Sequence, residues 1–184
     1  MTPFSNQMQR SFPTPLGAVA RGALAGIAGT LAMDVLLFVR YRRDGGSDSF
    51  HSWEFSTGLN DWDSAPAPAQ VGRRLVEGVF QRKLADRHAA LVNNITHWAY
   101  GVGAAAQFGL LGGSVRKPRI SYGIPFGAAV WASSYVVLPA AGLYKPIWQY
   151  DRTTLAKDLT AHLVYGAATA AVFDRLLPRR QGTS

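Results

Sequence analysis

Hydrophobic residues gather in four long runs that carry few charges, and most charged residues lie between these runs. The runs cover residues 17–39, 94–115, 121–144 and 159–177 and are rich in Ala and Gly. A run of about 20 mainly apolar residues is long enough to cross the hydrocarbon core of a bilayer as a helix. The pattern therefore predicts an all-α integral membrane protein, a four-helix bundle within residues 17–177.

The connection between the first two runs, residues 44–93, has two parts. Its first part is rich in Gly, Ser and Asp and contains Trp53 and Trp62, which is typical of a loop at the membrane interface. Over residues 69–92, apolar and charged positions then alternate with helical periodicity. This predicts one amphipathic helix that lies on the bilayer surface or against the bundle. Residues 1–16 and 178–184 are expected to form a flexible N-terminal segment and a basic tail.

The second and fourth runs open with the same motif, and the first and third runs share another. The corresponding positions are His97 and His162, Tyr100 and Tyr165, Gly101 and Gly166, Gly22 and Gly123, Gly26 and Gly127, and Asp34 and Tyr135. A Gly-x-x-x-Gly spacing lets two helix backbones approach closely in lipid. We therefore expect an internal repeat of two similar helix hairpins with the same polarity. The glycines are expected to pack helices within the chain or between the chains of a homo-oligomer.

The polar residues of these motifs should lie at one depth, because the second and fourth spans run in the same direction. This predicts an intramembrane cluster of six side chains: His97, His162, Asp34, Tyr100, Tyr165 and Tyr135. Hydrogen bonding between helices is one interpretation. Proton handling is another, since a histidine titrates near pH 6.5 and burial makes a carboxyl easier to protonate.

Two further interpretations place a ligand on the same cluster. Haem b held between His97 and His162 would make the protein a redox subunit. A divalent metal held by these histidines and Asp34 is the other. Ser133 and Ser134 have no evident base or oxyanion partner, so no catalytic residue is assigned and an enzyme is not expected. A role as a small transporter stays open, because parallel repeats occur among transporters.

The charge balance indicates which partners to expect. The formal net charge is +8, and the basic residues flank the apolar runs. Anionic lipid headgroups are therefore the expected counter-charge, and no nucleic-acid-binding motif is present. The chain has no cysteine, which excludes disulfides, thiolate catalysis and Cys-bound metal clusters. The tight basic turn at residues 116–119 favours cytoplasmic termini by the positive-inside rule.

Several segments together carry a family resemblance. They are residues 91–101, which end in His97-Trp98-Ala99-Tyr100-Gly101, residues 126–131, Leu138-Pro139, and residues 161–166. Over about residues 17–177 the chain resembles the YagU-like family of small bacterial inner-membrane proteins. The resemblance implies an inner-membrane location, no established enzyme activity and a link to acid response. Related chains often carry an acid near Ser134, so a symmetric mechanism with two acids is in doubt here.

Overall fold

The computed structural model describes residues 13–114 and 120–177, and these residues form an all-helical fold without strands. The long helices are α1 (Pro15–Arg43), α4 (Ala89–Gly113), α5 (Gly123–Ala140) and α6 (Arg152–Leu176). The short helices are α2 (Phe50–Glu54) and α3 (Ala67–Phe80), and single 3₁₀ turns lie at Asp86–His88, Ile120–Tyr122 and Ile147–Gln149. The predicted all-α class is confirmed. Pro15–Arg43 and Ile120–Ala140 are long and apolar enough to cross a membrane.

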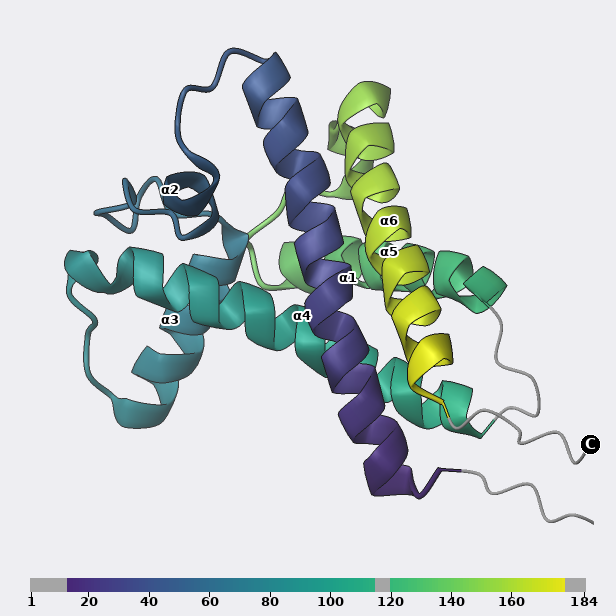
Figure 1. The fold of residues 1–184 in the computed structure, drawn as a ribbon. Coiled ribbons are helices and arrows are strands. Elements are labelled where there is room, and N and C mark those ends of the chain that lie inside the picture. Colours follow the sequence, from purple (N-terminus) through teal and green to yellow (C-terminus); the bar gives the residue numbers. More distant parts are fainter. Residues whose placement is uncertain (1–12, 115–119, 178–184) are drawn as a thin grey trace, which may run out of the picture.

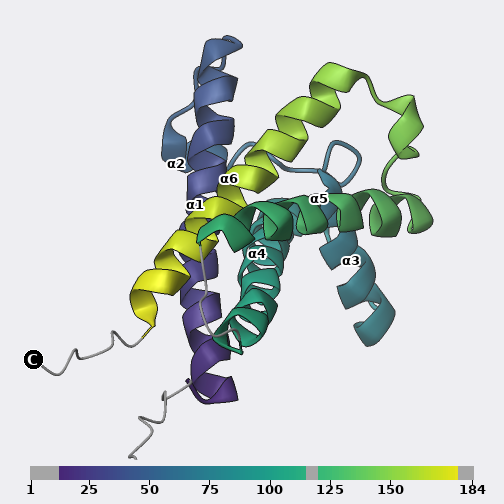
Figure 2. The same ribbon diagram turned by 90° about the vertical axis from the view of Figure 1, so that its right-hand side faces the viewer.

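The long helices pack in the order α4, α1, α6, α5 (Figure 1). In Figure 1, α1 and α6 run steeply beside each other, whereas α4 and α5 run across them. The view turned by 90° shows the same crossing of α5 with α1 and α6 (Figure 2). The helices therefore cross one another instead of running closely parallel.

Glycines bring the crossing helices into backbone contact. A Cβ atom added to Gly22 would lie 2.8 Å from the Cα of Gly109 on α4. A Cβ atom added to Gly123 would lie 2.8 Å from the Cβ of Ala170 on α6. Both pairs therefore pack at a separation that a larger residue would prevent.

The described core consists mainly of small residues and a few aromatic rings. Phe108 of α4 and Phe173 of α6 pack edge to face with ring centroids 5.7 Å apart, next to the buried Ala25 and Ala170. Large aliphatic side chains lie on the outside instead. Among them are Leu24, Ile27, Leu31, Ile95, Leu111, Ile124, Val136 and Val137, all at least 42% exposed.

The connection between α1 and α4 differs from its prediction. Residues 50–54, expected to be loop, form α2, and the helix expected over residues 69–92 ends at Phe80. Gln81 adopts a left-handed conformation with φ of 53°, and residues 89–92 belong to α4. The carboxylate of Glu77 accepts the Leu84 N–H at 2.9 Å, which stabilises the turn.

Trp62 is buried and does not lie at an interface as expected. It is 3% exposed, packs beside Ala69 and Ala89, and donates from its indole N–H to the Leu84 carbonyl at 3.1 Å. This small second core holds α3 against α4. The helix bounds also differ from the predicted spans. α1 runs from Pro15, inside the predicted flexible segment, to Arg43, α4 begins at Ala89, and α6 begins at Arg152, whereas α5 ends at Ala140, before the predicted end at residue 144.

Some predictions concern residues outside the described part of the chain. They are the N-terminal segment over residues 1–12, the basic turn at 116–119 and the basic tail at 178–184.

Candidate functional site

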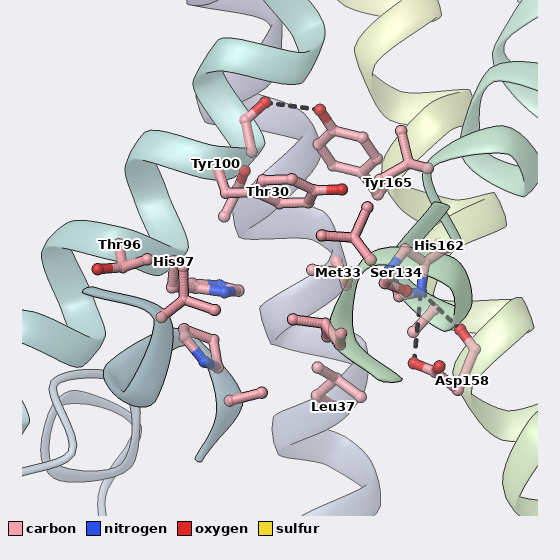
Figure 3. Close-up of a pocket in the computed structure, with 18 of the residues that line it drawn as sticks. Thr30, Met33, Leu37, Thr96, His97, Tyr100, Ser134, Asp158, His162 and Tyr165 are labelled. Atoms are coloured by element: carbon pink, nitrogen blue, oxygen red, sulfur yellow. Dashed lines mark hydrogen bonds and ion pairs between the residues drawn. The ribbon is translucent and has the colours of Figure 1, made fainter. Parts of the chain in front are cut away.

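A cavity of about 310 Å³ lies between α1, α3, α4, α5 and α6. Its wall combines apolar side chains with a set of polar and aromatic ones (Figure 3). The polar and aromatic members are Thr30, Thr96, His97, Tyr100, Ser134, Tyr144, Asp158, His162 and Tyr165. Five sequence-predicted residues therefore border one cavity: His97, His162, Tyr100, Tyr165 and Gly101.

His97 pairs with Asp34 across the α1–α4 interface. The Nε2 atom of His97 lies 3.1 Å from both carboxylate oxygens of Asp34, which is only 3% exposed. A carboxylate at this depth needs a partner, because an unpaired buried charge is costly. The imidazole is that partner, so the two residues form one unit.

A second carboxyl lies beside this unit. Glu54 of α2 is 9% exposed and accepts the indole N–H of Trp98 at 3.1 Å. Burial raises the pKa of Glu54, and the negative charge of Asp34 raises it further. His97 thus has one acid from α1 and another from α2 in its surroundings.

His162 has a different acidic partner, supplied by its own helix. Its Nδ1 atom lies 3.0 Å from the carbonyl oxygen of Asp158 and 3.4 Å from a carboxylate oxygen of the same residue. Because a carbonyl oxygen only accepts, Nδ1 of His162 carries a proton. The hydroxyl of Tyr135 donates to the other carboxylate oxygen of Asp158 at 2.9 Å. Tyr135 is therefore linked to His162 through Asp158, whereas Asp34 contacts His97 directly.

The two tyrosines of the shared motif have different roles. Tyr165 is 2% exposed, and its hydroxyl donates to the Gly101 carbonyl at 2.6 Å, joining α6 to α4. Tyr100 is 52% exposed, and its hydroxyl lies 3.3 Å from the Ser133 hydroxyl. The glycines of the motif also pack differently, because Gly101 faces Thr30 and Gly166 faces Gly123.

The structure thus places the two predicted histidines in separate histidine–carboxylate units beside one cavity, His97 with the predicted Asp34 and His162 with Asp158. Figure 3 shows His97 and His162 on opposite sides of that cavity. Among the residues that the structure describes, no group of three or more His, Cys, Asp or Glu is placed to hold a metal. The haem b and metal interpretations stay predictions, which the visible absorption spectrum and metal content of purified protein would test.

Sequence reasoning missed several members of the site, among them Asp158, Thr30 and Glu54. Asp158 had a usable signal, because it precedes His162 by four residues and so shares its helical face. Thr30 and Glu54 had none, since their roles depend on contacts with other helices.

Comparison of the chain with protein-family models, curated proteins and solved structures gives no match. The resemblance to the YagU-like family therefore stays a prediction.

Proposed function

We propose that this chain is a multi-pass membrane protein that takes up protons at the cavity between its helices. The observation that carries the proposal is the pair of histidine–carboxylate units, His97–Asp34 and His162–Asp158, whose two histidines line a single cavity. Histidine is the side chain whose charge ordinarily changes near neutral pH, which makes it a suitable proton acceptor for such a unit. The expected location is the bacterial inner membrane, as the family resemblance implies.

The distribution of side-chain size supports a membrane setting. In water, large aliphatic residues are buried and drive folding, whereas helices in lipid associate through small residues at their interfaces. Here Gly and Ala lie between the helices, and exposed Leu, Ile and Val lie outside them. Lipid tails would cover these outer side chains without cost.

The length of α4 and α6 is compatible with spanning, although among the described helices only Pro15–Arg43 and Ile120–Ala140 are also apolar enough. Each of α4 and α6 has 25 residues, which gives a length of roughly 37 Å, and α4 contains no Asp, Glu, Lys or Arg. The charged residues of α6 lie toward its ends. Because the four long helices cross steeply, all four can span one bilayer only if each is tilted, and tilts up to about 40° are known.

The short helix α3 suits an anionic membrane surface. Leu75, Val79 and Phe80 are 62–73% exposed and form an apolar end, and Arg74 and Arg82 lie beside them in the sequence. Apolar side chains inserted among headgroups, with basic ones near the phosphates, are typical of interfacial helices.

Cysteine labelling tests the four-span arrangement, because the natural chain has no cysteine. Single variants Ser47→Cys, Ser114→Cys and Thr153→Cys are reacted with a membrane-impermeant maleimide in sealed right-side-out vesicles. Four spans require Ser47→Cys and Thr153→Cys to label from one side and Ser114→Cys from the other. If only α1 and α5 span, Ser47→Cys and Ser114→Cys label from the same side and the arrangement is wrong. With cytoplasmic termini, Ser47→Cys labels from outside.

Tryptophan fluorescence tests proton uptake, because the ring of Trp98 lies 6.5 Å from that of His97. In nanodiscs, the natural protein is expected to show a change between about pH 5 and 8. The double variant His97→Gln/His162→Gln should lose this change, and the exposed-site control His51→Gln should keep it. A double variant with the natural pH profile would overturn the proposal.

A further inference from the structure

The geometry points to a ligand class for the cavity: an organic cation with an apolar body, bound in competition with protons. This inference rests on the proposed function, since it uses the same two histidine–carboxylate units. It adds the chemical class of the ligand that proton uptake would displace from the cavity.

The charges around the cavity favour a cation. Asp158 lines the cavity directly, and Asp34 lies behind His97 at 3.1 Å. Among the described residues that line the cavity, none is lysine or arginine. With neutral imidazoles, the carboxylates therefore have no cationic side chain of the cavity wall to balance them.

Protonation of the imidazoles reverses this preference. His97 faces Asp34 of α1 and Glu54 of α2, and His162 faces Asp158, which also accepts from Tyr135 of α5. Two protons on the histidines would balance the charges of Asp34 and Asp158. A bound cation and these protons thus satisfy the same carboxylates, and each disfavours the other.

The remaining wall suits an apolar body with a cationic end. The side chains of Tyr100, Tyr144 and Tyr165 line the cavity, and tyrosine faces attract cations, most strongly where water is excluded. Val130 and Leu138 add aliphatic surface. An anion would meet carboxylates without a basic partner, and a neutral molecule would bind without regard to pH.

Binding of benzyltrimethylammonium to the full chain in nanodiscs tests the inference by isothermal titration calorimetry. This probe has a permanent charge, so any pH dependence belongs to the protein. We expect binding at pH 8 that weakens at least tenfold at pH 5.5, and no saturable binding of the neutral isostere neopentylbenzene. Empty nanodiscs give the background.

Variants assign the binding to the cavity. Asp158→Asn should weaken binding at pH 8 at least tenfold, Asp158→Glu should retain it, and Asp174→Asn, an exposed site on the same helix, should not change it. If Asp158→Asn does not fold, the double variant His97→Gln/His162→Gln serves as the test. It should bind the probe with the same affinity at pH 8 and pH 5.5. Equal binding of the isostere, or no binding of the probe at any pH, overturns the inference. The latter result leaves the proposed function standing if the fluorescence change persists.

Discussion

The contact between Gly22 of α1 and α4 gives the sharpest test of how the helices pack. In the variant Gly22→Ala, the new Cβ would lie 2.8 Å from the Cα and 3.0 Å from the N atom of Gly109, and still closer to the Ala105 carbonyl oxygen. All three are backbone atoms of α4, which cannot rotate away. The new methyl group must therefore push the helices apart.

The distances indicate how much stability the variant Gly22→Ala should lose. Ordinary Cβ contacts begin at about 3.4 Å, so the contact with Gly109 must open by at least 3.4 − 2.8 = 0.6 Å. Overpacking of this kind costs about 1–3 kcal/mol. Replacing a helical glycine by alanine returns up to ~1 kcal/mol through helix propensity. A control with the same propensity gain and no clash isolates the packing cost.

Gly103 supplies that control, because it lies on α4 and a Cβ added there meets nothing within 4 Å. We expect Gly22→Ala to be less stable than Gly103→Ala by about 1–3 kcal/mol. The measurement is SDS-induced unfolding in mixed micelles, followed by far-UV circular dichroism. If both variants unfold at the same SDS fraction, the close α1–α4 contact is absent and the reasoning is refuted.

Three further predictions concern other contacts. Gly123→Ala should destabilise the α5–α6 pair by about 1–3 kcal/mol in the same assay, because the new Cβ would lie 2.8 Å from that of Ala170. Tyr165→Phe should cost about 1–2 kcal/mol, because it removes a buried hydrogen bond of 2.6 Å. Glu54→Gln should raise the thermal unfolding temperature at pH 7 and leave it unchanged at pH 4. The folded protein raises the pKa of Glu54 above its usual 4.5, so the stability that Glu54 contributes is present below pH 4.5 and is lost as pH rises through the raised pKa.

Matched control variants distinguish these specific effects from a nonspecific loss of stability. Tyr100→Phe, at the exposed tyrosine of the motif, should change stability little, so an equal loss in both tyrosine variants would contradict the role of Tyr165. Glu77→Gln should lower stability at pH 7, because hydrogen bonds from Leu84 and Arg73 lower the pKa of Glu77. If both glutamate variants shift stability in the same direction, burial is not what distinguishes Glu54.

Residues near one another in sequence determined much of the secondary structure. The apolar runs formed α1, α4, α5 and α6, because length and composition favour a helix in each. The helix predicted from periodicity over residues 69–92 was wrong, because the apolar pattern continues through a turn after Phe80. There the buried Trp62 and the carboxylate of Glu77 bind Leu84, and contacts with distant residues outweigh helical periodicity.

The tertiary structure alone decided which carboxylate pairs with His97. The repeated motif predicted that His97 and His162 belong to one polar cluster, since both occupy equivalent positions on their helices. It did not show that His97 pairs with Asp34 whereas His162 pairs with Asp158. The His97–Asp34 pairing depends on how α1 and α4 cross, and backbone contacts such as that at Gly22 set this crossing. Asp158 instead lies one helical turn before His162 on α6. A sequence pattern specifies which face a residue occupies, but distances between faces arise only when the helices pack.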